Sequence, residues 1–162
     1  CPTIQLSMGR LMKRTLVTGG AGFIGSHLVD RLLKDGHEVI VLDNFSTGRP
    51  QNLDNHKENK KLRIVEADIA EFHAIEQYFD GIDWVFHIAA LADIVPSIKF
   101  PFAYHRSNVD GTISVLEASR THNIKRFIYA ASSSCYGIPD VFPTPEDADI
   151  RPQYPYALTK NV

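Results

Sequence analysis

Apolar residues follow two alternating patterns from residue 14 onward. Short runs rich in β-branched and aromatic side chains predict five strands, at residues 14–17, 38–42, 62–66, 84–88 and 126–131. Apolar positions at helical spacing predict helices between them, at residues 23–34, 71–80 and 102–121. Strands that alternate with helices form right-handed βαβ units, so this order predicts an α/β fold with a doubly wound parallel sheet.

The longest predicted helix, residues 102–121, carries an expectation about the core. Its apolar face is predicted to consist of Val109, Ile113, Val115, Leu116 and Ala118. We expect this face to pack against the sheet.

Composition limits the class of protein. The 162 residues are 44% hydrophobic, and 17 Lys and Arg against 19 Asp and Glu give a net charge of −2. This balance excludes a disordered chain and lacks the basic surface typical of nucleic-acid binding. No apolar run approaches the roughly 20 residues of a membrane span. We therefore expect neither nucleic acid nor a membrane as a partner.

The N-terminal segment, the cysteines and the histidines refine the picture. Residues 1–13 lack the apolar stretch of a secretory signal and are expected to be an extension that precedes one domain, residues 14–162. Cys1 and Cys135 cannot make a disulfide framework, which indicates a reduced, cytoplasmic setting. The histidines show no metal-ligand spacing, so no metal is predicted. His87, inside an apolar strand, is interpreted as a buried, hydrogen-bonded core residue.

A glycine-rich loop joins the first predicted strand to the first predicted helix. Its sequence is Gly19-Gly20-Ala21-Gly22-Phe23-Ile24-Gly25, which satisfies Gly-x-Gly-x-x-Gly from Gly20. Such glycines allow a tight turn, close approach of a pyrophosphate and close packing of helix on strand. The N–H groups and dipole at a helix start attract phosphate. With a strand before it and a helix after it, the loop predicts a Rossmann-type dinucleotide site.

An acidic residue stands where such a site requires one. Asp43 follows the second predicted strand, about 20 residues after the glycines. Its carboxylate can accept hydrogen bonds from both ribose hydroxyls and would repel a 2′-phosphate, which favours NAD over NADP. Arg49, close in sequence, weakens that preference.

A serine run and a Tyr–Lys pair supply candidate chemistry. Ser132-Ser133-Ser134 follows the fifth predicted strand, at the sheet edge where α/β proteins bind ligands. Tyr156 and Lys160 share one face of a helix that Pro155 can begin. The lysine charge favours the tyrosine phenolate, and a serine hydroxyl can hold a substrate oxygen. This set suits removal of a proton from an alcohol as hydride leaves the same carbon.

Taken in order, these motifs resemble those of the extended short-chain dehydrogenase/reductase family, specifically its NAD-dependent nucleotide-sugar epimerases and dehydratases. The matching stretches are residues 18–25, 43–44, 68–69, 87–90, 132–137 and 156–160. They cover nearly the whole chain.

The resemblance implies roles for individual residues around NAD. It implies pyrophosphate contacts from Gly19, Gly22, Phe23, Ile24 and Gly25, ribose contacts from Asp43, Asn44, Ser46, Thr47 and Gly48, and adenine contacts from Asp68 and Ile69. It implies that the path of the cofactor is lined by Ala89, Ala90 and Leu91, with Asn108 nearby, and that it reaches Tyr156 and Lys160. The implied catalytic residues are Ser132, Tyr156 and Lys160, and the implied substrate contacts are Ser132, Ser133 and Ser134.

Two departures bear on the reaction. Similar 4,6-dehydratases carry Thr-Asp-Glu, and UDP-glucuronate decarboxylases usually a Glu, within the segment that is Ser132-Ser133-Ser134 here. The resemblance therefore favours 4-epimerases of UDP-hexoses or UDP-N-acetylhexosamines, in which hydride leaves C4 and returns to the other face of a 4-keto intermediate. Ala92 stands where galactose epimerases often have Lys, which favours acetamido or uronic sugars. Cys135 replaces a family Val and is interpreted as a small buried hydrophobe.

The same resemblance implies a protein about twice as long, since the chain stops two residues after Lys160. We therefore expect this chain to be the NAD-binding part of an epimerase, without the substrate-binding part. We expect the full-length epimerase to be a homodimer. Because helix ends fray, Tyr156 and Lys160 are expected to be poorly placed. Two alternatives stay open. One is another extended short-chain oxidoreductase, dehydratase or decarboxylase acting on a nucleotide sugar, and the other is a non-catalytic NAD-binding fragment.

Overall fold

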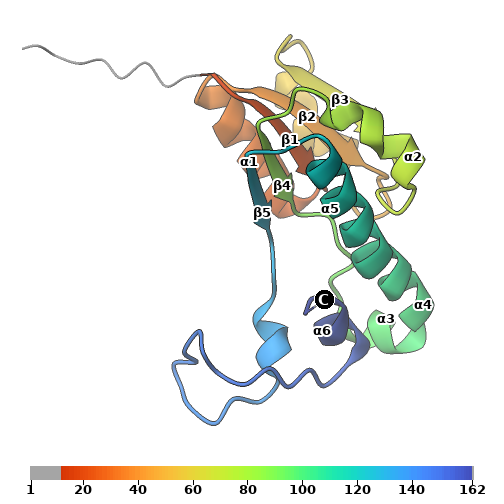
Figure 1. Cartoon of the computed structure of the whole chain (residues 1–162), viewed down its shortest axis with the longest axis vertical. Helices are drawn as coiled ribbons and strands as arrows, with labels where there is room; N and C mark the ends of the chain where they lie inside the picture. The colour runs from red at the N-terminus through yellow and green to blue at the C-terminus, as the bar shows by residue number, and fades with distance from the viewer. Residues whose placement is uncertain (1–11, 162) are drawn as a thin grey trace, which may run out of the picture.

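The computed structural model describes residues 12–161, so most of the predicted N-terminal extension lies outside the described residues. Its centre is a five-stranded sheet with the order β3-β2-β1-β4-β5 (Figure 1). The strands are β1 (Arg14–Thr18), β2 (Glu38–Asp43), β3 (Leu62–Glu66), β4 (Trp84–His87) and β5 (Arg126–Tyr129). All neighbouring strands pair in parallel, which confirms the predicted doubly wound fold. The strand order reverses at β1, so the sheet has its switch point between β1 and β4.

The helical segments follow the predicted order, with the unpredicted 3₁₀ turns η1 and η4 and three further differences. They are α1 (Phe23–Lys34), η1 (Pro50–His56), α2 (Phe72–Ile75), η2 (Glu76–Phe79), α3 (Ile94–Lys99), α4 (Pro101–Tyr104), η3 (His105–Asp110), α5 (Gly111–Thr121), η4 (Ser133–Tyr136) and α6 (Pro155–Thr159). The helix predicted at 71–80 divides into an α-helical and a 3₁₀ turn. The one predicted at 102–121 contains a π-helical stretch, η3. Helix α3 was not predicted.

Alternation along the strands divides the core into two layers. Leu16 faces one side of the sheet and Val17 the other, and both are fully buried. The first layer packs under α2, η2 and α5 and contains Leu16, Leu42, Ile69, Ile75, Phe79, Ile82, Val85, Val115 and Ala118. The second packs under α1 and η1 and contains Val17, Ala21, Val29, Leu32, Leu33, Val39, Val41 and Leu53. A parallel sheet covered on both faces holds the strand ends rigidly, and those ends carry the candidate site.

The predicted apolar face of α5 is wrong at two positions. Ile113 is 60% exposed and Leu116 47% exposed, although Val115 and Ala118 are buried as expected. The face toward the sheet is formed largely by small residues, among them Gly111, where an added Cβ would lie 2.7 Å from Ile69 Cδ1. Close approach of helix and sheet thus selects small side chains, and the larger apolar ones are left on the opposite side.

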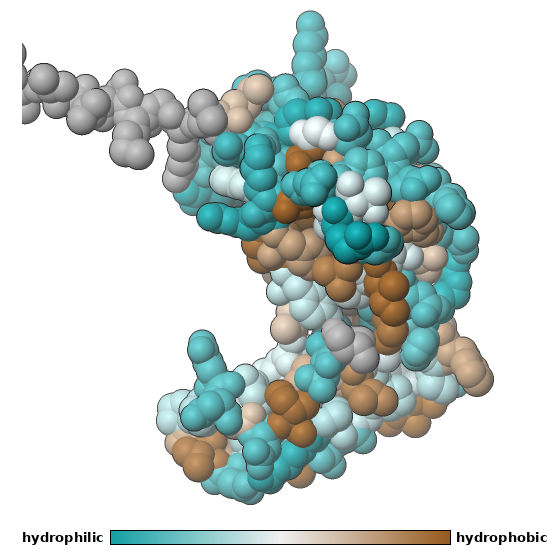
Figure 2. Space-filling model, in the orientation of Figure 1, coloured by the Kyte–Doolittle hydropathy of each residue, from teal (hydrophilic) through white to brown (hydrophobic). Residues whose placement is uncertain are grey.

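The segment after β5 leaves the sheet and forms a second lobe (Figure 1). There α6 packs against α3, α4, η3 and η4. The space-filling view shows a deep hollow between this lobe and the sheet (Figure 2). In the part of the chain that the structure describes, no helix combines the length and the apolar character needed to cross a bilayer.

Candidate functional site

The glycine loop between β1 and α1 requires glycine at two positions. Gly19 has φ of +70°, and a Cβ there would lie 2.7 Å from Ala89 Cα and N. A Cβ on Gly25 would lie 2.1 Å from the carbonyl oxygen of Gly19. The loop therefore folds tightly on itself and against the backbone that follows β4. Only hydrogen fits at these two positions.

The start of α1 is suited to bind an anion. The first intrahelical bond runs from Ser26 N–H to Gly22 O, so the preceding N–H groups of the first turn have no partner inside the helix. No acidic side chain lies in that turn, while Arg31 and Lys34 lie in the last one. The dipole of this 12-residue helix thus presents uncompensated positive charge at the glycine loop.

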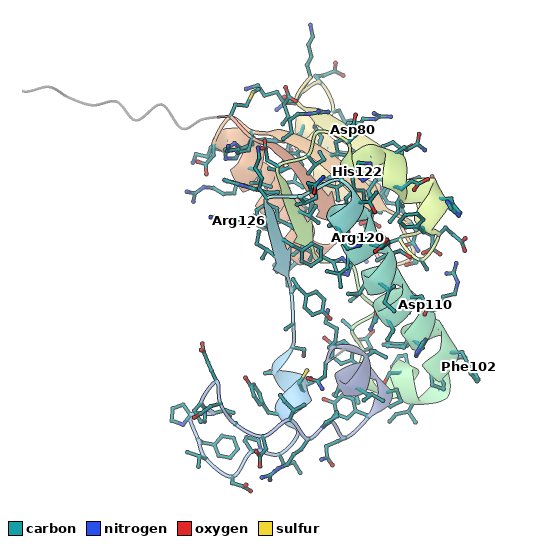
Figure 3. The ribbon with its side chains drawn as sticks, viewed as in Figure 1. Asp80, Phe102, Asp110, Arg120, His122 and Arg126 are labelled. Carbon is teal, nitrogen blue, oxygen red and sulfur yellow. The ribbon has the colours of Figure 1, made fainter. Side chains whose placement is uncertain are left out.

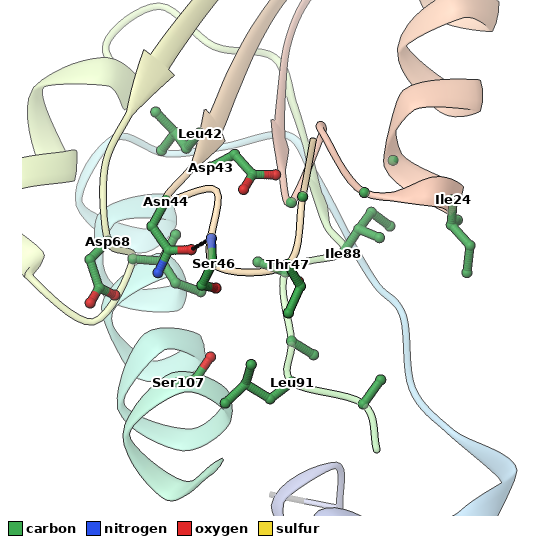
Figure 4. Close-up of a pocket in the computed structure, with 18 of the residues that line it drawn as sticks. Ile24, Leu42, Asp43, Asn44, Ser46, Thr47, Asp68, Ile88, Leu91 and Ser107 are labelled. Atoms are coloured by element: carbon green, nitrogen blue, oxygen red, sulfur yellow. Dashed lines mark hydrogen bonds between the residues drawn. The ribbon is translucent and has the colours of Figure 1, made fainter. Parts of the chain in front are cut away.

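A pocket of about 320 Å³ opens beside this loop, at the carboxyl ends of the strands (Figure 4). The structure brings into its lining most of the residues expected to contact a dinucleotide: Gly19, Gly22, Phe23, Ile24, Gly25, Asp43, Asn44, Ser46, Thr47, Gly48, Asp68, Ile69, Ala89, Ala90 and Leu91. The lining also includes Leu42, Ala67, Ile88, Ala92 and Ser107, which were not predicted. Each of these residues is adjacent in sequence to a predicted contact, so this adjacency could have indicated that they line the pocket.

Asp43 has a structural role as well as a place in the pocket wall. It is 7% exposed; its Oδ2 accepts a hydrogen bond from Ala21 N–H at 2.9 Å, and its Oδ1 one from Phe45 N–H at 2.9 Å. Gly48 packs so closely that a Cβ there would lie 2.8 Å from Oδ1. The carboxylate therefore ties the glycine loop to the end of β2, where it is part of the pocket lining.

At another part of the wall, Arg106 of η3 holds Asp68. Its guanidinium donates to Asp68 Oδ2 at 2.6 Å and to Glu71 Oε1 at 2.5 Å, and Ala70 N–H donates to Asp68 Oδ1 at 3.0 Å. Partial burial acts to raise the pKa of Asp68, but the bonds from Arg106 and Ala70 outweigh it, so the pKa lies below its ordinary value. Asp68 thus lines the pocket as a carboxylate.

These features fit a dinucleotide. Bare backbone and a helix start suit a pyrophosphate, and fixed carboxylates suit the hydroxyl and amino groups of a nucleoside. Within residues 12–161, no group of three His, Cys, Asp or Glu side chains is placed to hold a metal ion.

The expected catalytic residues lie in the second lobe and outside this pocket. Ser132 Oγ accepts a hydrogen bond from Ser134 N–H at 3.2 Å at the start of η4. The Tyr156 ring lies 6.5 Å from that of Tyr104, and Lys160 N–H bonds to Tyr156 O at 3.1 Å. In the described part of the chain, no hydrogen bond joins the side chains of Ser132, Tyr156 and Lys160.

Lys160 is more firmly held than a frayed helix end. It is 5% exposed, and its Nζ lies 4.2 Å from the centre of the Tyr129 ring. Burial lowers the pKa of Lys160 from its ordinary 10.5 to about 8. The group therefore keeps most of its charge at neutral pH. The expectation of a poorly placed lysine is not met, because β5 provides a ring against which it packs.

Two further residues have contacts that spacing did not predict. Asn108, expected beside the cofactor, does not line the pocket; its Oδ1 accepts from Leu91 N–H at 2.8 Å, and its Nδ2 donates to Leu91 O at 3.0 Å and Thr159 Oγ1 at 3.0 Å. Asn108 therefore holds the loop after β4 in place and does not open onto the pocket. Cys135 is a buried free thiol 3.7 Å from Ala157 O, as expected of a small core residue.

Comparison with known proteins gives a consistent result. Residues 15–162 match the model of the NAD dependent epimerase/dehydratase family. A UDP-glucose 4-epimerase from Mycolicibacterium smegmatis is 42% identical over 150 residues, which cover 91% of this chain and 48% of that protein. The chain thus spans about half the length of the curated relatives it matches.

Solved structures agree in fold. A UDP-N-acetylglucosamine 4-epimerase from Methanobrevibacter ruminantium M1, in complex with UDP-N-acetylmuramic acid, has a TM-score of 0.87 at 37% identity and matches over 93% of this chain and 47% of its own. A UDP-glucose 4-epimerase from Brucella ovis, in complex with NAD, has a TM-score of 0.81 at 35% identity. The match covers 92% of this chain and 45% of that protein. Sequence and fold together show that this chain belongs to the NAD dependent epimerase/dehydratase family.

Proposed function

We propose that this chain is the NAD-binding part of a UDP-sugar 4-epimerase. The observation that carries the proposal is the pocket in which the free N–H groups of α1, Asp43 and Asp68 meet at one edge of the sheet. The relatives named as 4-epimerases and the neighbours crystallised with NAD support the same assignment. The activity belongs to a complete protein of about twice this length.

The chain's own residues then have defined tasks. NAD, when bound, supplies an acceptor and later a donor of hydride at C4 of the sugar. Tyr156 takes the proton of the 4-hydroxyl, and Ser132 donates a hydrogen bond to the same oxygen. The proton returns from Tyr156 when hydride returns to the other face, so no net oxidation occurs. Ser133 and Ser134 have no carboxyl group to eliminate water, which supports epimerisation over dehydration.

Cofactor choice is a direct test on this chain. Calorimetric titration is expected to show NAD binding and at least tenfold weaker binding of NADP, because Asp43 repels a 2′-phosphate. In the variant Asp43→Asn the preference should fall, because that charge is lost. Asp54→Asn, which alters an exposed carboxylate paired with Lys57 at 3.0 Å, is the matched control and should behave as wild type. Failure to bind NAD, or a preference for NADP, would contradict the proposed cofactor.

We also infer that the complete protein is a homodimer. Large apolar side chains are exposed along three helices: Phe102 of α4 at 88%, Ile113 and Leu116 of α5 at 60% and 47%, and Leu158 of α6 at 57%. Phe102 points away from the body of the molecule (Figure 3). Exposed apolar surface of this kind is typical of a protein–protein interface.

Substitution of Ile113 tests the dimer. In the complete protein, Ile113→Glu should shift the mass measured by analytical ultracentrifugation from dimer to monomer, because the interface would have to bury a charge. Thr121→Glu, at the exposed end of the same helix, should leave the mass unchanged. A dimer that persists in Ile113→Glu would show that α5 is not part of the interface.

A further inference from the structure

His87, at the end of β4, is the centre of a buried chain of hydrogen bonds. The side chain is 1% exposed. Its Nδ1 lies 2.7 Å from Thr18 Oγ1 on β1, and its Nε2 lies 2.9 Å from Thr112 Oγ1 on α5. The imidazole thus connects two neighbouring strands and the helix that covers them, across 69 and 25 residues of sequence.

The partners determine the direction of every bond in this chain. Thr112 has one hydroxyl proton, and its Oγ1 lies 2.5 Å from Asn108 O, a carbonyl that can only accept. Thr112 must therefore accept from His87, so the ring proton is on Nε2. Nδ1 then accepts the Thr18 hydroxyl proton, which leaves Thr18 Oγ1 to accept from Ala89 N–H at 3.2 Å. Each donor meets an acceptor, and only the neutral Nε2–H imidazole completes the set.

The surroundings keep the imidazole neutral. Burial lowers the pKa of His87 to about 3, and the positive charge of Lys160 acts in the same direction. The titratable groups that face the ring are Lys160 and Tyr129, whose ring stacks on that of His87 with centroids 5.6 Å apart. In the described residues no carboxylate contacts His87, so nothing nearby stabilises an imidazolium.

Both ends of this chain of hydrogen bonds hold the same short segment of backbone. At one end, Thr18 Oγ1 accepts a hydrogen bond from Ala89 N–H. At the other end, the Asn108 carbonyl accepts a hydrogen bond from the Thr112 hydroxyl, and the Asn108 side chain bonds to the backbone of Leu91. The loop between, residues 89–91, lines the dinucleotide pocket and lies against Gly19. The distance from β1 to η3 across His87 therefore sets the position of this pocket wall.

We propose that His87 is a positioning residue for the cofactor: as an Nε2–H imidazole bonded to Thr18 and Thr112, it holds residues 89–91 in register with the glycine loop. The proposal rests on the proposed function for its ligand, NAD, but the tautomer and the hydrogen bonds can be tested without it. Direct proton exchange with a ligand is not part of this role, because His87 is 1% exposed and its ring nitrogens contact the hydroxyl groups of Thr18 and Thr112.

The first test is spectroscopic and uses the unmodified chain. In ¹⁵N-labelled protein, with His87 assigned through its backbone connectivities, the side chain should show a protonated Nε2 and an unprotonated Nδ1 from pH 5 to pH 8. An Nδ1–H tautomer, or titration near the ordinary histidine value of about 6.5, would overturn the proposal. Neither result depends on whether NAD binds.

The second test removes one hydroxyl from the chain of bonds. Thr112→Val should weaken NAD binding about tenfold, because the loss of one buried hydrogen bond corresponds to about that change in affinity. Thr112→Ser keeps the hydroxyl and should restore the affinity for NAD. The matched control is Ser119→Ala on the same helix, which removes another buried hydroxyl, bonded to Val115 O at 2.7 Å, and should leave NAD affinity unchanged.

Amide hydrogen exchange separates this proposal from the proposed function. In Thr112→Val the N–H groups of Ala89 and Leu91 should exchange about tenfold faster than in Thr112→Ser or Ser119→Ala, with or without cofactor. Unchanged exchange at both amides would overturn the positioning role even if the unmodified chain binds NAD. Faster exchange together with no NAD binding by the unmodified chain would support the positioning of the loop and contradict the proposed cofactor instead.

Discussion

Replacing Gly25 with alanine is expected to abolish useful NAD binding by this chain. The new Cβ would lie 2.1 Å from Gly19 O and 2.8 Å from Gly20 Cα, both of which are backbone atoms that cannot move independently. The start of α1 and the glycine loop would have to separate. Loss of two charge-assisted bonds from the N–H groups to phosphate corresponds to about a hundredfold lower affinity, measurable by calorimetry.

A second glycine provides the control for Gly25→Ala. Gly36 has φ of +89°, and a Cβ there would have no atom within 4 Å. Gly36→Ala should therefore reduce stability by about 1 kcal/mol through backbone strain alone and retain NAD affinity. If Gly25→Ala binds NAD as tightly as Gly36→Ala does, the phosphate is not held at the start of α1.

Replacing Tyr156 with phenylalanine in the complete protein should reduce epimerisation about 100-fold to 10,000-fold, the range that a general base contributes. The variant keeps the aromatic ring, and with it the contact with Tyr104, but loses the phenolic oxygen to which the proposed mechanism assigns the proton. NAD affinity should stay within a few-fold of wild type, because the pocket lining does not include this residue. Conversion of UDP-sugars is the activity to follow, with NADH absorbance as a check that no net oxidation takes place.

The neighbouring Tyr154 makes the comparison specific. It precedes α6 and has no proposed part in proton transfer. Tyr154→Phe should retain full turnover, so a loss confined to Tyr156→Phe would identify the phenol as the base. Turnover unchanged in Tyr156→Phe would remove that residue from the mechanism.

The local parts of the fold could be predicted closely. Helix α1 and strand β3 have the predicted bounds. A clear apolar period followed by Gly36 specifies α1, and a short run with β-branched residues specifies β3, from nearby residues alone. Helix α3 was missed: it has six residues with Pro96 among them, so neither length nor propensity indicated a helix. The exposed Ile113 and Leu116 misled the assignment of the buried face, because large apolar residues also occur on exposed surfaces and residue type alone does not tell which side of a helix packs on the sheet.

The sequence by itself determined the order of the strands and helices, the glycine loop with the acid after β2, and thereby a dinucleotide site at the carboxyl edge of a parallel sheet. The order of elements follows from local apolar periodicity, and the glycine loop with its acid follows from spacing within the first βαβ unit. Only the tertiary structure decided that Asn108 holds Leu91, that Lys160 lies buried on Tyr129, and that Thr18, His87 and Thr112 form one directed chain. These contacts join residues far apart in sequence, and they exist only once strand register and helix packing have brought the groups within hydrogen-bonding distance.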